Sequence, residues 1–136
     1  MSPSDDRPAV ERLLGTIRPL IVRYCRARLA SLPSADATAR EVCLAVLAAW
    51  PSDRGSLLAF VYRIAAQKVA AVPSREHSQQ FVVLPERLRE ILVLRVVVGL
   101  SAEQTAEAVG STPSAVRLAQ HRALVRLREA IDGANG

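Results

Sequence analysis

Hydrophobic residues recur every three or four positions along most of this chain, which is the spacing of one face of an α-helix. The pattern covers residues 9–32, 34–50, 57–72, 85–98, 102–109 and 113–131. A proline inside the first segment, Pro19, predicts either a kink or two shorter helices there. The run ILVLRVVV would suit a buried strand by composition, but no second strand is predicted to pair with it. The pattern therefore predicts an all-α protein.

The last third of the chain carries the start and stop signals of a helix-turn-helix. Ser101 with Gln104 three residues later forms a capping box, in which the hydroxyl and the amide satisfy backbone groups at a helix start. Gly110 follows this short helix, where a residue without a Cβ can adopt a left-handed turn. Thr112 and Pro113 then suit the N-cap and the first position of a second helix.

The second of these helices separates apolar from basic side chains. Its apolar positions are expected to face the interior, and they are Val116, Ala119, Ala123, Leu124, Leu127, Ala130 and Ile131. The outward face carries Arg117, Leu118, His121, Arg122 and Val125, with further arginines at Arg126 and Arg128. Because the sequence has no acidic residue from 112 to 128, this face suits an anion such as the DNA backbone. An ordinary helical hairpin whose arginines only contact solvent is the alternative.

Polar residues without a helical period separate two groups of three helices. The segment PSREHSQQ has this character, and PSDRGS at residues 51–56 is expected to form a shorter loop inside the first group. We therefore expect two small helical domains. The first is an N-terminal helical bundle at residues 1–72, and the second is a C-terminal helix-turn-helix domain at residues 82–136, with a linker at residues 73–81.

The charge of the chain favours a nucleic-acid partner. The 136 residues carry a net charge of +5 and a pI of about 10.2, and all but one of the 18 basic residues are arginine. The planar guanidinium of arginine suits phosphates and guanine edges. An acidic protein partner or a lipid surface would also suit a basic chain, so the placement of the arginines on a recognition-type helix carries the argument.

The sequence contains no glycine-rich phosphate loop and no HExxH pair, so we expect a protein that is not an enzyme and that holds no metal or other cofactor. Cys25 and Cys43 lack CxxC spacing and are expected to be buried. His77 suits a surface position on the linker, whereas His121 is a candidate DNA contact. No apolar run approaches the roughly 18 residues of a membrane span, and the N-terminus lacks a secretory pattern, which predicts a cytoplasmic protein.

The segment LPERLREILVLRVVVGLSAEQTAEAVGSTPSAVRLAQHRALVRLREAI closely resembles the C-terminal promoter-binding domain of extracytoplasmic-function (ECF) sigma factors, particularly actinobacterial sigma-D-like members. The segments IRPLIVRYCRARL, AREVCLAVL and LLAFVYRIAAQKVA resemble pieces of the core-binding and promoter-melting domain of that family. The resemblance implies a sigma factor that directs RNA polymerase core to specific promoters. Its first domain would engage and open the minus-ten element, and its second would bind the minus-thirty-five element. The implied partners are promoter DNA, the clamp and flap of the large polymerase subunits, and an anti-sigma factor.

The same resemblance assigns roles to individual residues. Those implied to bind DNA from the recognition helix are Thr112, Ser114, Arg117, Leu118, His121, Arg122 and Arg126. Those implied to melt the promoter are Phe60, Tyr62 and Arg63, and those implied to dock on the polymerase clamp are Asp36, Arg40 and Glu41.

Three departures from the family pattern bear on these roles. Ala37 and Thr38 stand where the clamp helix usually carries an acid and an apolar residue, and the third helix stops before Pro73 where the family continues into basic residues. The linker is also short, because about a dozen extended residues reach at most ~40 Å, whereas the two promoter elements lie about 70 Å apart.

We therefore expect either that a segment near residues 72–80 is missing from this chain, or that the domains pack together in a closed, DNA-incompetent arrangement. The alternative function is a degenerate sigma-like interaction protein that binds an anti-sigma factor or polymerase without melting DNA. A dimeric helix-turn-helix repressor is a third possibility.

Overall fold

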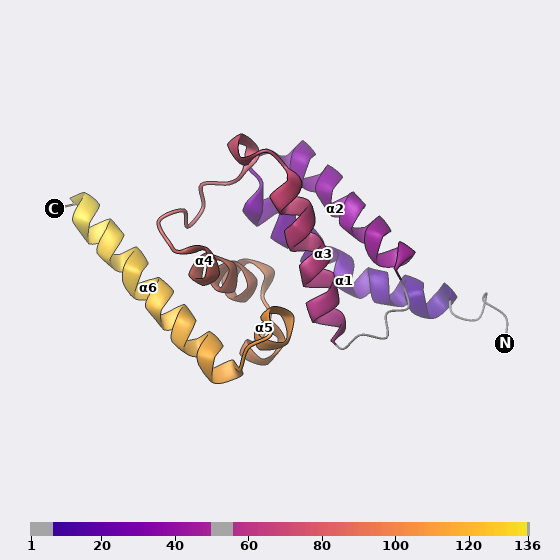
Figure 1. Cartoon of the computed structure of the whole chain (residues 1–136). Coiled ribbons are helices and arrows are strands. Elements are labelled where there is room, and N and C mark those ends of the chain that lie inside the picture. Colours follow the sequence, from indigo (N-terminus) through magenta and orange to yellow (C-terminus); the bar gives the residue numbers. More distant parts are fainter. Residues whose placement is uncertain (1–6, 50–55, 136) are drawn as a thin grey trace.

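The computed structural model of this protein describes residues 7–49 and 56–135 (Figure 1). Its helices are α1 (Arg7–Arg28), α2 (Leu32–Ala48), α3 (Leu57–Ala71), α4 (Glu86–Leu92), α5 (Ala102–Val109) and α6 (Pro113–Asn135). A short 3-10 helix, η2 (Ser74–Glu76), precedes α4, and a π-helical segment, η3 (Val93–Val98), continues it. Within the described ranges, the only β contact is one isolated bridge between Leu29 and His77. The all-α prediction is confirmed, while the loop predicted at residues 51–56 lies outside the described residues apart from Ser56.

The first helix runs through Pro19 without a break, so the prediction of two shorter helices there is wrong. Proline has no backbone N–H, so the carbonyl of Gly15, four residues earlier, has no donor in the helix. Pro19 and Gly15 are both exposed. Water can therefore satisfy that carbonyl, and the cost of the proline is limited. The helix ends at Arg28 rather than at residue 32, because the backbone of Leu29 instead meets His77.

The second and third helices begin at serine N-caps and pack on α1 as a three-helix unit. The Ser31 hydroxyl accepts from the backbone N–H of Ser34, so α2 begins earlier than the sequence predicts. The Ser56 hydroxyl likewise accepts from the N–H of Ala59. Cys25 and Cys43 are buried between these helices as free thiols, which confirms their predicted burial.

The continuous helical segment formed by α4 and η3 lies at the centre of the molecule and contributes to all three hydrophobic cores. Ile91 packs with Val116 of α6, and Leu92 packs with Ala123 of α6. Leu94 and the neighbouring valines of η3 turn instead toward α1 and α3 and share the largest core with them. Most of the run ILVLRVVV is buried because several elements cover it, and only Val96 within it is exposed, which explains why the run is nearly apolar all round and shows little amphipathic period. The two predicted domains therefore pack together. Close packing of the domains was one of the two arrangements expected from the short linker.

The segment between α3 and α4 is tied to the first unit rather than loose. The backbone N–H of Ala30 donates to the carbonyl of Glu76, and the N–H of Ser78 donates to the carbonyl of Arg28. The Nε2 atom of His77 lies 3.0 and 2.8 Å from the carbonyl oxygens of Val69 and Val72. His77 thus caps the end of α3, and the prediction of an ordinary surface histidine is wrong.

Candidate nucleic-acid interface

Local hydrogen bonds build the turn between α5 and α6 as the sequence predicts. The Ser101 hydroxyl accepts from the N–H of Gln104 at 3.0 Å, and the Gln104 side chain accepts from the N–H of Ser101 at 2.9 Å. Gly110 adopts the left-handed conformation, with φ of 69°. The Thr112 hydroxyl accepts from the N–H of Ala115 at 3.2 Å, which caps the start of α6. The helix-turn-helix geometry therefore follows from contacts that span only a few residues.

The first half of α6 presents the predicted face to solvent. All seven residues proposed as DNA contacts on this helix are exposed, namely Thr112, Ser114, Arg117, Leu118, His121, Arg122 and Arg126. Val116 and Ala123 are completely buried on the opposite side. In Figure 1, α6 lies along the edge of the molecule away from α1 and α2, and it packs on α4 and α5. The structure thus places six of these residues on one accessible helix and Thr112 at its N-cap.

The predicted interior stripe is wrong for the second half of α6. Leu124 is 49% exposed and Ile131 is 60% exposed, and Ala130 is also exposed. The reason is length, because α6 extends past the helices that cover its first half (Figure 1). Leu127 still packs on the core formed with Leu84 and Leu92, but the apolar period continues to Ala130 and Ile131, which are exposed.

Two arginines of this unit make hydrogen bonds that were not predicted from the sequence. Nη2 of Arg117 donates to Oε1 of Glu103 at 2.7 Å, which joins the recognition helix to the first turn of α5. The backbone N–H of Glu103 and then Arg117 hold the pKa of the Glu103 carboxyl below its usual range. Arg95 of η3 donates to the Gln120 side chain and to the carbonyl of Leu100, both at 2.8 Å. For the contact between Arg117 and Glu103, the only signal in the sequence was the position of Glu103 in the first turn of α5, which does not show which residue it contacts.

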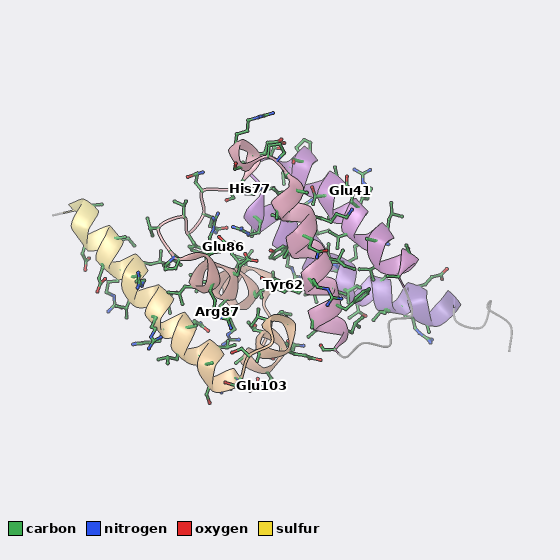
Figure 2. All side chains as sticks on the ribbon, viewed as in Figure 1. Glu41, Tyr62, His77, Glu86, Arg87 and Glu103 are labelled. Atoms are coloured by element: carbon green, nitrogen blue, oxygen red, sulfur yellow. The ribbon has the colours of Figure 1, made fainter. Side chains whose placement is uncertain are left out.

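The residues proposed to dock on polymerase lie on α2, on the opposite side of the molecule from α6. Figure 2 shows Glu41 on this outer surface, and Asp36 and Arg40 line a groove of about 470 Å³ between α1 and α2. Arg26 donates to both carboxylate oxygens of Asp36, at 3.0 and 3.2 Å, and this contact lowers the pKa of Asp36. Leu44, at 65% exposure, adds an apolar edge to the same groove.

Leu47 also lies at this edge. The helical period of residues 34–50 places Leu47 on the same apolar stripe as Val42, Cys43 and Val46, but Leu47 is exposed whereas those three are buried. The α2 surface therefore combines charged groups with two uncovered leucines.

The residues proposed to melt the promoter have three different environments on α3. Phe60 is buried in the core that the two units share. Arg63 is exposed, with its guanidinium carbon 5.9 Å from the centroid of the Phe60 ring. Tyr62 is half-buried and turns toward α4, as Figure 2 shows. Of the three side chains, only Arg63 is freely available to a ligand in this arrangement.

A buried polar cluster connects Tyr62 to both units. The hydroxyls of Tyr24 and Tyr62 donate to the same oxygen of Glu90, Oε1, at 2.5 and 2.7 Å. The other Glu90 oxygen lies 2.9 Å from Nε of Arg28, at ion-pair distance but without hydrogen-bond alignment. Arg28 also donates to Glu86 at 3.0 Å. Burial, and then the Glu90 carboxylate, raise the pKa of both tyrosines far above the ordinary value.

The described residues hold no group of three or more histidine, cysteine, aspartate or glutamate side chains that could bind a metal ion. None of the helices in the described ranges is both long enough and apolar enough to cross a membrane.

Comparison with known proteins gives four matches: one family, two curated relatives and one solved structure. Residues 81–127 match the family described as sigma-70, region 4. The chain is 46% identical to the ECF RNA polymerase sigma factor SigD of Mycobacterium tuberculosis, over 93% of this chain and 78% of SigD. It is 41% identical to the ECF RNA polymerase sigma factor ShbA of Streptomyces griseus, over 90% of this chain and 87% of ShbA. The structure is similar to that of CnrH in complex with the cytosolic domain of CnrY, with a TM-score of 0.70 at 20% identity over 96% of this chain and 92% of CnrH.

The alignment with SigD spans 166 positions, which exceeds the 136 residues of this chain. The relative therefore carries residues for which this chain has no counterpart.

Proposed function

Because this chain belongs to the ECF RNA polymerase sigma factors and serves promoter-directed transcription initiation, we propose that its two helical units divide that work between them. Residues 82–136 bind the minus-thirty-five element through α6. Residues 1–72 dock on polymerase core through α2 and engage the minus-ten element through α3, and residues 73–81 connect the two units. The chain acts by binding in the cytoplasm and carries out no chemical step of its own.

The observation that carries the proposal for α6 is its uncovered basic face. Arg117, Arg122, Arg126 and Arg128 are all exposed on one helix that begins at a capped turn. Side chains near the start of such a helix reach base edges in the major groove, while those further along reach phosphates. Arg117 therefore suits base recognition, and Arg126 suits a phosphate contact.

The α2 groove supports docking on polymerase. Arg40 and Glu41 are exposed, and Leu44 and Leu47 give the groove an apolar edge. An apolar ridge flanked by charges is a typical surface for a partner helix. We propose that this surface binds the polymerase clamp and that the second unit, residues 82–136, binds the flap of the other large subunit. An anti-sigma factor is a further proposed partner.

Promoter-specific run-off transcription tests the proposal. Purified mycobacterial core polymerase is given this chain and a pool of promoter fragments, and defined transcripts are expected only when the chain is present. The variant Arg117→Ala should lose most of the transcripts while it retains wild-type helical content. If no fragment in the pool yields a transcript above that of core polymerase alone, the chain does not initiate transcription in the proposed way.

One observation favours the alternative of a sigma-like interaction protein that does not melt DNA. Phe60 is buried and Tyr62 is bonded to Glu90, so two of the three proposed melting residues are occupied within the chain. The two functions differ in a permanganate footprint, which detects unpaired thymines. Reactive thymines near the start site would support the initiation factor, and polymerase binding without them would support the alternative.

A further inference from the structure

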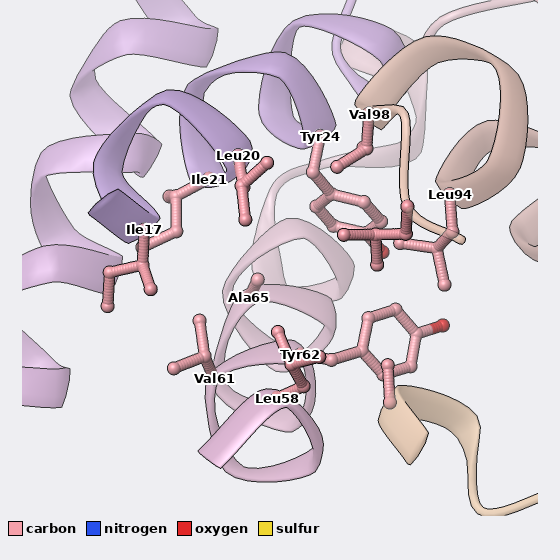
Figure 3. Close-up of a pocket in the computed structure, with 12 residues that line it drawn as sticks. Ile17, Leu20, Ile21, Tyr24, Leu58, Val61, Tyr62, Ala65, Leu94 and Val98 are labelled. Atoms are coloured by element: carbon pink, nitrogen blue, oxygen red, sulfur yellow. The ribbon is translucent and has the colours of Figure 1, made fainter. Parts of the chain in front are cut away.

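The contact between the two units covers the part of α3 that carries Tyr62. Leu94 and Val98 of η3 meet residues of α1 and α3 in one core. Figure 3 shows the rings of Tyr24 and Tyr62 beside these two η3 side chains. The rings lie edge to face, with centroids 5.8 Å apart. The second unit thus packs on the same surface of α3 that we propose for promoter melting.

Glu90 is the polar centre of this contact. It is 9% exposed, and one of its oxygens accepts from two tyrosine hydroxyls that come from α1 and α3. Its other oxygen faces Arg28 of α1. Hydrogen bonds to a charged acceptor in a buried site are stronger than those between neutral groups. We call Tyr24, Tyr62, Glu90 and Arg28 the Glu90 latch.

The contact has features of one that can open. A cavity of about 40 Å³ remains between the apolar side chains of the two units (Figure 3). Nη1 of Arg28 is buried without a hydrogen-bond partner among the described residues, which destabilises the closed state. A groove of about 670 Å³ lies beside the latch and admits solvent close to Tyr62.

The connection also permits opening. The backbone anchors to the first unit end at Ser78, and α4 begins at Glu86. The intervening residues reach roughly 20 Å when extended, at about 3.3 Å each. Arg89 of α4 donates to the carbonyls of Ser78 and Gln80, and these hydrogen bonds must break for the connection to extend. Once they break, the second unit can leave α3 while the chain remains connected and η2 stays in place.

The two proposed DNA surfaces are not equally covered. The helix α6, which carries the exposed arginines, lies on the far side of α4 from α1 and α3 (Figure 1). Duplex binding through α6 therefore requires no change at the Glu90 latch, whereas access to Tyr62 requires the latch to open.

We propose that the second unit inhibits the promoter-melting surface of α3 in cis through the Glu90 latch, so that the free chain binds duplex DNA but engages unpaired DNA only after the latch opens. This inference rests on the proposed function of α3. A ligand whose site is available only in a minor state binds with an affinity reduced by the population of that state. Loss of the latch should therefore strengthen binding to single-stranded DNA and leave duplex binding unchanged.

The variant Glu90→Gln tests the latch. The matched control is Glu11→Gln, which changes the net charge by the same amount at an exposed position of α1. The chain has only two tyrosines, and both belong to the latch. The charged groups around them are Glu90, Glu86 and Arg28. Titration of tyrosinate absorbance thus reports on the latch without DNA. In wild type and Glu11→Gln neither tyrosine should ionise near pH 10, whereas in Glu90→Gln Tyr62 should ionise at about pH 10.

Fluorescence anisotropy then measures binding to a labelled mixed-sequence single strand and to the corresponding duplex. Glu90→Gln should bind the single strand about tenfold more tightly, with duplex affinity within about twofold of wild type. If the tyrosines of a folded Glu90→Gln still resist ionisation, the latch does not hold the units together. If they ionise but single-strand affinity is unchanged, the latch exists but does not inhibit DNA binding, and the proposal is overturned.

A second variant guards against misfolding. If circular dichroism shows that Glu90→Gln is unfolded, Tyr24→Phe removes one hydrogen bond with little change in shape and leaves Tyr62 as the only reporter. The same changes in titration and single-strand binding are expected, and their absence overturns the proposal. Run-off transcription stays a separate test, because the titration reports on the latch whether or not the chain initiates transcription.

Discussion

The ion pair between Glu103 and Arg117 gives a prediction about how the recognition helix uses its charge. The change is Glu103→Gln, which keeps the shape of the side chain and removes its charge. Both side chains are more than half exposed, at 64% and 57%, so loss of the pair should leave the urea midpoint of unfolding close to that of wild type. The effect is expected in DNA binding rather than in stability.

The magnitude follows from the four exposed arginines of α6. In the free chain, Arg117 is bound to Glu103 at 2.7 Å, which leaves Arg122, Arg126 and Arg128 to neutralise phosphates. Each neutralised phosphate contributes about −0.9 to the slope of log K against log salt concentration. Three arginines give a slope of about −2.7 and four give about −3.6. Glu103→Gln should therefore steepen the slope by up to about 0.9.

The same change should reduce sequence preference, because Glu103 holds the guanidinium of Arg117 where it can meet a base edge. The assay is fluorescence anisotropy over a series of salt concentrations, on a duplex selected from a random library and on a random duplex. Glu11→Gln on the distant α1 is the control for net charge. If Glu103→Gln matches wild type in both slope and preference, or if Glu11→Gln produces the same shift, the pair does not tune DNA binding.

Three further predictions concern α6 and the core. Val116→Ala removes two fully buried methyl groups and should lower the free energy of unfolding in urea by about 2 kcal/mol, whereas a loss below about 0.5 kcal/mol would mean that the site is not packed as described. Arg117→Ala should cost roughly 1–3 kcal/mol on the preferred duplex only, and Arg126→Ala should weaken all duplexes alike; equal losses on both duplexes for both variants would contradict this division. Burial raises the pKa of Cys25 to about 12, so its thiol should resist iodoacetamide at pH 8 until the chain is denatured, and rapid labelling of the native chain would contradict this. Because the pKa of Cys25 is higher in the folded chain than in the unfolded chain, its contribution to stability is fully present below about pH 9. That contribution is lost as the pH rises toward 12.

The sequence by itself determined the helices and the turn between α5 and α6. The capping box of Ser101, the left-handed Gly110 and the N-cap Thr112 all act on neighbours within four residues. Such contacts form in the same way whatever surrounds them, so they can be read from the order of residues. The burial of Val116 and Ala123 could also be predicted, because helical periodicity sets which residues share a face.

The tertiary structure alone decided which side chains meet across the molecule. Glu90 lies 66 positions from Tyr24 and 28 from Tyr62, so only the packing of α4 on α1 and α3 brings them together. Periodicity shows which face of a helix is apolar, but it does not show whether another element covers that face. This is why the same apolar stripe is buried at Ala123 and exposed at Ile131, and why a residue proposed to melt DNA, Tyr62, is bonded to the chain's own second unit.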